Sequence, residues 1–338
     1  MPYKRDDQLT LNVSSPRRSK ESLGHVEEPP DEQIFLDNEY YTRYPNAWSR
    51  IREAIREPMA EFFGVFIMIA VGAGVDCQAV TSANKNVAAT PKGDWMSISI
   101  GWACSVALGV WFSAGVSGGH LNPAITIALA TFRGFPWRKV PGYIFAQLMG
   151  ALCGAGVAYA NYIHAIDIYE GGRHIRTVPG TASMFSTYAL DYMTDVSAVF
   201  DEFLGTVTLL LVVCAVTDPR NGPLQPGMLP IAMFMTILVE GLGFGMQTGY
   251  ALNPARDLGP RMLTAMVGYG KDVFTFRHQY WLWAAVITPI VIGAFLYDLF
   301  FYTGLESPLN RPCAAALRAY QRAKEVQRHR PITGADAV

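Results

Sequence analysis

The tetrapeptide Leu-Asn-Pro-Ala occurs twice in this chain of 338 residues, at positions 121–124 and 252–255. Asn followed by Pro and a short apolar run predicts a helix start, because the Asn side chain caps the helix and Pro at the first helical position loses no hydrogen bond. The amide and the positive end of the helix dipole offer positive partial charge, which suits neutral oxygen atoms and repels cations. The residues concerned are Asn122, Pro123, Ala124, Asn253, Pro254 and Ala255.

Reactive side chains elsewhere do not form the patterns of common enzymes. Six histidines are present, but no His-Glu-x-x-His or Gly-x-Ser-x-Gly motif accompanies them. The 5 cysteines lie apart, without the spacing of a metal site or a disulfide framework. His120, beside the first box, could respond to pH near neutrality, but packing within a loop is favoured. We therefore expect no enzyme activity, no metal and no cofactor.

The composition indicates which elements must position the two boxes. Hydrophobic residues make up 51% of the chain and charged residues 16%, as is typical of membrane proteins, and the net charge of −1 gives no reason to expect nucleic acid. A helix needs roughly 20 mainly apolar residues to span about 30 Å of hydrocarbon. Six stretches meet this length, at about 59–80, 96–114, 140–162, 197–217, 228–248 and 280–302.

The two halves of the chain repeat each other. The first span opens with the sequence AEFFG at 60–64 and the fourth with DEFLG at 201–205, and each half contains one box. Because each half contributes three spans, an odd number, the two boxes enter the membrane from opposite faces. The apolar runs that follow them, at about 125–131 and 258–267, are too short to span. We therefore expect two half-helices that meet near the midplane, where they line a wet cavity.

The boxes, the two span openings and the sequence Ser117-Gly118-Gly119-His120 resemble the aquaporin superfamily over about residues 59–302. This resemblance implies an all-α membrane fold with six transmembrane helices and two re-entrant half-helices in an inverted 3+3 repeat. It also implies a passive hourglass pore in each subunit of a homotetramer, with Asn122 and Asn253 at the waist. In this family, carboxylates such as Glu61 and Glu202 hold the re-entrant loops by accepting backbone N–H bonds.

Residues around the second box resemble the aquaglyceroporin branch, and fungal members in particular. The signature consists of Asp257, Arg261, Pro289 and Ile290. Matching offsets from the two asparagines place the outer constriction at Trp102, Gly241, Tyr250 and Arg256. Water channels typically carry His at the position of Gly241, so the resemblance implies a wider pore. The family more often has Phe at the position of Tyr250. The expected solutes are glycerol, similar small neutral molecules and water, with protons and ions excluded.

Two other functions share parts of this pattern. A strict water channel would have the same boxes, and a proton-coupled secondary transporter would have the same inverted repeat. A transporter is expected to carry unpaired charged residues along its spans. Besides the matching Glu61 and Glu202, the candidates considered are Asp76 and Asp298 near span ends.

The predicted organisation is a flexible tail at 1–55, a channel domain at 56–303 with repeats at about 56–165 and 195–303, and a second tail at 304–338. Most of the 27 Lys and Arg residues lie on the side of both termini, which we therefore expect in the cytoplasm, with the protein in the plasma membrane. Ser19, after Arg17 and Arg18, is a candidate regulatory phosphosite. The connection at 163–194 is expected to cover the extracellular mouth.

Overall fold

The computed structural model describes residues 46–222, 224–276 and 282–328, with side chains except at 282–290 and 326–328. The chain divides into two compact units, Met1–Arg56 and Glu57–Val338. The described part of the first unit is the start of helix α3 (Ala47–Ser82), where Asn46 Oδ1 accepts a hydrogen bond from the Ser49 backbone at 2.9 Å. Ser19 lies outside the described residues.

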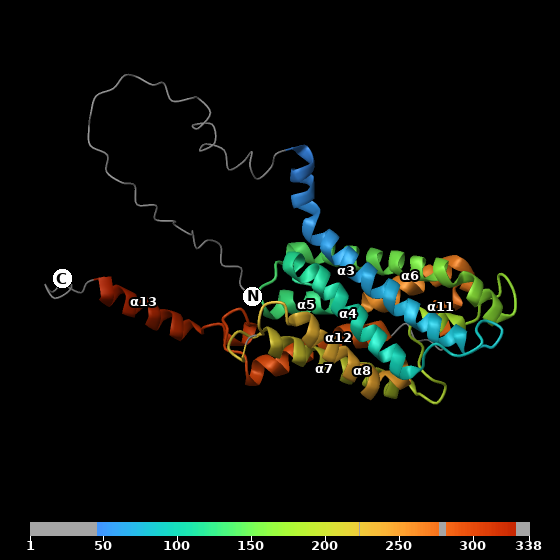
Figure 1. Ribbon diagram of the computed structural model, residues 1–338. Coiled ribbons are helices and arrows are strands. Elements are labelled where there is room, and N and C mark those ends of the chain that lie inside the picture. The colour runs from blue at the N-terminus through green and yellow to red at the C-terminus, as the bar shows by residue number, and fades with distance from the viewer. Residues whose placement is uncertain (1–45, 223, 277–281, 329–338) are drawn as a thin grey trace, which may run out of the picture. The chain divides into compact units, whose positions relative to one another are not determined.

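The second unit is built from helices that lie side by side (Figure 1). No strand occurs in the described ranges, which confirms the predicted all-α class. After α3, the helices are α4 (Trp95–Ser117), α5 (Pro123–Phe132), α6 (Val140–Glu170), α7 (Asp195–Thr217), α8 (Leu229–Gly243), α9 (Gly245–Thr248), α10 (Pro254–Thr264), α11 (Asp272–Thr275), α12 (Leu282–Phe300) and α13 (Ala314–Arg328). Extensive helix contacts join α7 to α12, α4 to α8 and α6 to α10.

Four of the described helices are long and apolar enough to cross a membrane, namely Ala47–Ser82, Trp95–Ser117, Trp137–Glu170 (a 3-10 turn followed by α6) and Asp195–Thr217. The predicted fifth span is divided, because Phe244 leaves helical geometry at φ −126° and ψ −11° between two glycines and separates α8 from α9. The helix α12 covers most of the sixth predicted span, whose first residues lie outside the described ranges.

Two element boundaries differ from the sequence prediction. The helix α6 continues past Tyr162 to Glu170 and ends where Gly171 adopts a left-handed φ of 84°, so the following connection begins later than expected. The second half-helix, α10, is followed by a π-helical turn at Ala265–Tyr269. Gly268 interrupts this turn with a φ of 110°, which an L side chain rarely adopts.

The distribution of side chains is that of a membrane protein. Large apolar residues such as Trp111, Phe145 and Phe200 are more than half exposed on the long helices, whereas carboxylates such as Glu61 and Glu202 are fully buried. A soluble protein hides its apolar residues and exposes its carboxylates. Lipid reverses this preference at the outer surface of the bundle, and the buried polar groups require partners inside it.

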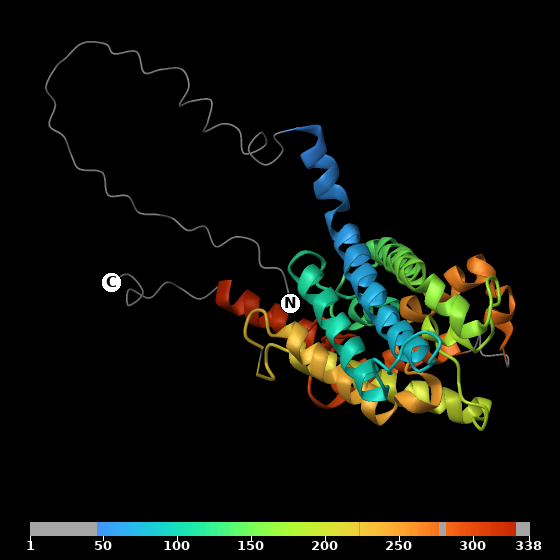
Figure 2. The same ribbon diagram turned by 45° about the vertical axis from the view of Figure 1, so that its right-hand side comes forward.

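Small residues let the helices approach closely, as at the contact between α3 and α6, which lie alongside each other in both views (Figures 1 and 2). A Cβ at Gly150 of α6 would overlap the carbonyl oxygen of Phe62 on α3, and one at Gly154 would overlap the carbonyl oxygen of Phe66. Close approach of this kind is how helices associate in lipid, where no hydrophobic force drives them together.

Candidate functional site

Each Asn-Pro-Ala box caps a half-helix. Asn122 has extended geometry (φ −151°), and its Oδ1 accepts a hydrogen bond from Ala124 N at 2.9 Å at the start of α5. Asn253 (φ −150°) does the same at the start of α10, where its Oδ1 accepts from Ala255 N at 2.9 Å. Pro123 and Pro254 occupy the first helical positions. The capping geometry expected from the sequence is therefore present at both sites.

The two boxes contact each other directly. Asn122 Nδ2 donates to Leu252 O at 2.8 Å, and Asn253 Nδ2 donates to Leu121 O at 2.8 Å. Leu121 and Leu252 adopt left-handed φ values of 52° and 51°. A side-chain amide carries two N–H groups, so each Asn has a second one with which it can donate to another oxygen atom. The two half-helices thus bring two amides and two helix N-termini to one place in the bundle.

Buried carboxylates bind the backbone in front of each box. Glu61 Oε1 accepts from His120 N at 3.0 Å, and Glu61 Oε2 accepts from Leu121 N at 2.7 Å and from Gln147 Nε2 at 2.7 Å. In the second repeat, Glu202 Oε1 accepts from Ala251 N at 3.0 Å, and its Oε2 accepts from Leu252 N at 3.2 Å. These bonds satisfy backbone donors that point away from any helix ladder.

The four residues expected in the constriction contact each other in two pairs. Arg256 Cζ lies 4.2 Å from the centre of the Trp102 ring. A Cβ built on Gly241 would lie 3.2 Å from Tyr250 Cζ and 3.1 Å from Ser99 Oγ. Because nearly all Cβ contacts in proteins are longer, a larger residue at position 241 would have to displace Tyr250 or Ser99. The space at this point therefore depends on glycine.

Asp257 and Arg261, two of the four signature residues, contact each other, whereas Arg256 has other partners. Asp257 pairs with Arg261 at 2.8 Å, and its Oδ1 also accepts from Thr187 N at 2.8 Å. Arg256 instead directs Nη1 toward Phe185 O at 3.4 Å. Phe185 and Thr187 belong to the connection before α7, so this loop lies against the start of α10. Pro289 and Ile290 lie on α12, at positions whose side chains are outside the description.

Two acidic residues have positions that the sequence reading did not anticipate. By its sequence position Asp76 is a charge near the end of a span, but in the structure its Oδ2 accepts a hydrogen bond from Trp102 Nε1 at 3.0 Å. Glu240, next to Gly241, was missed, although a search of the fifth span for acidic residues would have found it. It is fully buried, and neither of its carboxylate oxygens has a hydrogen-bond partner within the described ranges. Nothing in its contacts explains why a carboxylate occupies this position.

The other candidates are held in packing contacts. His120 Nδ1 lies 3.2 Å from Thr126 Oγ1, and its ring packs against Phe135. Asp298 forms an ion pair with Arg133 at 2.7 Å. No cluster of His, Cys, Asp and Glu that could hold a metal occurs among the residues with described positions.

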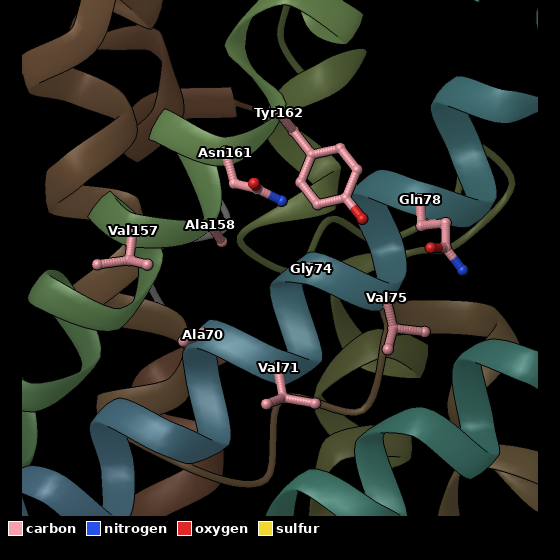
Figure 3. Close-up of a pocket in the computed structure, with 9 residues that line it drawn as sticks. All are labelled: Ala70, Val71, Gly74, Val75, Gln78, Val157, Ala158, Asn161 and Tyr162. Atoms are coloured by element: carbon pink, nitrogen blue, oxygen red, sulfur yellow. The ribbon is translucent and has the colours of Figure 1, made fainter. Parts of the chain in front are cut away.

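A pocket of about 350 Å³ opens between α3 and α6, lined on one side by Gly74 and Gln78 and on the other by Asn161 and Tyr162. The ring of Tyr162 reaches from α6 toward α3 (Figure 3). None of the residues expected in the pore lines this pocket. It is therefore separate from the site between the half-helices.

Comparison with known proteins agrees with this geometry. Residues 48–301 match the family described as Major intrinsic protein. The chain is 57% identical over 283 residues to Aquaporin-6 of Laccaria bicolor, covering 83% of this chain and 90% of that protein. It is 43% identical over 303 residues to Aquaglyceroporin-9 of Botryotinia fuckeliana, covering 87% of this chain and 64% of that protein.

Among solved structures, the aquaglyceroporin from Plasmodium falciparum matches with a TM-score of 0.62 and 32% identity, covering 73% of this chain and 96% of that chain. The helical bundle and the paired half-helices agree with these matches, which identify the protein as an integral membrane channel for water and small solutes and not an enzyme. The chain belongs to the major intrinsic protein family, which is the aquaporin superfamily.

Proposed function

We propose that this channel conducts glycerol and similar small neutral polyols together with water. The observation that carries the proposal is the set of contacts around Gly241, where the absence of a side chain lets Tyr250 and Ser99 lie close to the backbone of α8, while Trp102 lies under Arg256. The two aromatic rings offer apolar surface to the carbon atoms of a polyol, and the guanidinium offers N–H donors to its hydroxyls. The names of Aquaglyceroporin-9 and of the solved aquaglyceroporin support the same solute class.

In this proposal, the waist between Asn122 and Asn253 excludes protons and ions. The second N–H of each amide donates to the oxygen of the permeating molecule, and the N-termini of α5 and α10 add positive partial charge. Removing an ion from water costs on the order of 20 kcal/mol in the idealised low-dielectric limit, which a narrow pore without full coordination does not offset. Neutral solutes lose much less and pass.

Glu61 and Glu202 act as scaffolds in the proposed mechanism. Each uses both carboxylate oxygens to hold the loop before a box, so the left-handed Leu121 and Leu252 keep their carbonyls on the opposite asparagines. A coupling carboxylate of a transporter would instead need to release a proton to the solute path. The bonds to the backbone therefore favour passive flux.

The proposed assembly is a homotetramer in the plasma membrane with both termini in the cytoplasm. The excess of Lys and Arg on the side of the termini supports this orientation. Exposed apolar residues on α3, α4, α7 and α8 supply surface for neighbouring subunits and for lipid. The proposed tails at 1–55 and 304–338 flank the channel domain at 56–303.

The test is stopped-flow light scattering on liposomes that contain the purified protein, with empty liposomes as the control. We expect glycerol flux that is linear in the gradient and independent of a pH difference or a membrane voltage. Saturation at low glycerol concentration, or flux driven by a proton gradient, would contradict a passive channel.

A strict water channel is the competing function, because several relatives carry the name aquaporin without a named solute. The same vesicles distinguish the two functions. A water permeability well above that of empty liposomes, with glycerol flux no faster than theirs, would establish the water channel.

A further inference from the structure

Asp76 lies behind the constriction, on α3. Only 8% of the residue is exposed, and its Oδ2 accepts the hydrogen bond from Trp102 Nε1 at 3.0 Å. One turn earlier on the same helix, a Cβ at Gly72 would lie within 2.8 Å of three carbon atoms of the Trp102 ring. Gly72 and Asp76 together form a slot on α3 that receives the indole, which we call the indole slot. It determines both the position of the ring and the direction of its N–H.

The indole connects Asp76 to Arg256. Its N–H edge bonds to the carboxylate, and its face carries the guanidinium at 4.2 Å. The hydrogen bond to the Asp76 oxygen draws electron density away from the indole N–H proton and leaves the ring more electron-rich, which strengthens its attraction for a cation above its face. The three side chains therefore act as one unit within the constriction.

Two physical consequences follow for a passing solute. The Trp102 N–H is already occupied, so the ring offers an apolar wall and does not donate to a solute hydroxyl. The ring is also held at its edge and its face, so the aperture cannot widen without moving α3 or breaking the bond to Asp76. Rigid walls are what allow a pore to discriminate between solutes of similar chemistry by size.

We propose that Asp76 is a specificity-determining residue of this channel, which positions Trp102 through the indole slot and thereby sets the size limit for polyols. The inference rests on the proposed glycerol function. Asp76 is a positioning residue, because it acts through Trp102. Its carboxylate is needed as a hydrogen-bond acceptor at a fixed place, so an uncharged acceptor of the same shape can replace it.

The experiment compares glycerol with the four-carbon polyol erythritol in the same proteoliposomes, so that differences in folding and in protein amount cancel in the ratio. In Asp76→Val the acceptor is lost, the ring is released, and the glycerol-to-erythritol permeability ratio is expected to fall roughly tenfold, the upper end of the net contribution of one ordinary hydrogen bond. Asp76→Asn keeps an acceptor and is expected to stay within about twofold of the parent. Cys77→Ala, at the adjacent buried position on α3, is the matched control and is expected to retain the parent ratio.

A double-mutant cycle then tests whether Asp76 acts through the indole. Trp102→Phe keeps a ring but removes the N–H, and it is expected to lower the ratio as Asp76→Val does. Adding Asp76→Val to Trp102→Phe is expected to change the ratio no further, since the two residues form one unit. Should Asp76→Val fail to fold, Trp102→Phe beside Asp76→Asn still decides the matter.

The outcomes separate the two proposals. A parent channel that passes water but no glycerol overturns the proposed function and this inference with it. A parent that conducts glycerol, with Asp76→Val or Trp102→Phe keeping the parent ratio, overturns the role of Asp76 alone. Equal loss of selectivity in Asp76→Val and Cys77→Ala would assign Asp76 to general packing of α3 and would overturn the inference as well.

Discussion

At the scale of single residues, two glycines provide space for the aromatic side chains of the expected constriction. Gly241 has no side chain where a Cβ would lie 3.2 Å from Tyr250 Cζ, and Gly72 has none where the Trp102 ring lies. Asp257 and Arg261 pair with each other and leave Arg256 to stack on Trp102. Arg256, the arginine expected in the constriction, is thus not paired with the carboxylate next to it in sequence.

Gly241→His tests the constriction. The imidazole would have to displace Tyr250 or fill the space beside it, and the new donor suits water better than a three-carbon polyol. We expect glycerol permeability to fall at least tenfold more than water permeability in the same vesicles, because a packed pore does not yield easily. The measurement is normalised to the amount of correctly folded protein. If both solutes lose equally and the protein folds poorly, Gly241 is a packing residue of the α4–α8 contact and the glycerol proposal loses its main support.

At the scale of elements, small residues decide how closely the helices pack. Gly150 of α6 meets the backbone of α3, and Gly259 of α10 meets Ala151 of α6. These contacts place the half-helix α10 against the long helices, and so they set where Asn253 lies. Volume added at either contact has to move a helix backbone, since no flexible side chain can yield there.

Gly150→Ala is therefore expected to destabilise the fold by about 1–3 kcal/mol, the usual cost of overpacking. Gly142→Ala, in the same helix, is the matched control, because its Cβ would meet nothing within 4 Å. There the higher helix propensity of Ala is expected to stabilise by up to about 1 kcal/mol. Thermal unfolding of the detergent-solubilised protein, followed by circular dichroism, measures both. Equal transition temperatures for the two variants would show that the α3–α6 contact is looser than described.

At the scale of the whole molecule, we expect the second compact unit to carry the transport function by itself. The family match covers residues 48–301, and the compact second unit begins at Glu57. The residues with described contacts in the waist, the constriction and the scaffold all lie in that unit.

Removal of residues 1–45 is expected to leave water and glycerol permeability within about twofold of the full chain, because these residues precede the family match, which begins at residue 48. Stopped-flow measurements on liposomes with equal amounts of folded protein check this. A deletion through residue 66 is the contrasting variant, since it removes Glu61 and its bonds to the first loop, and it is expected not to fold. A large loss or gain of flux with residues 1–45 removed would show that the tail controls the channel.

The sequence by itself determined the membrane class, the inverted repeat and the two capped half-helices, since these depend on local patterns. An apolar run of spanning length indicates a transmembrane helix, and an Asn-Pro cap indicates a helix start. An odd number of spans per repeat inverts the second repeat in the membrane. It also placed Glu61 and Glu202 at equivalent positions in the two halves. The end of α6 at Glu170 and the break at Phe244 were not predicted, because glycine geometry after a helix depends on its surroundings.

Only the tertiary structure decided which side chains meet across the bundle. Asn122 and Asn253 lie far apart in sequence, yet each donates to the residue before the other. No sequence spacing shows that Asp76 bonds to the Trp102 indole, or that Glu240 is buried without a hydrogen-bond partner in the described ranges. Such contacts depend on helix rotation and on distances of a few ångströms, which arise only when all the helices pack together.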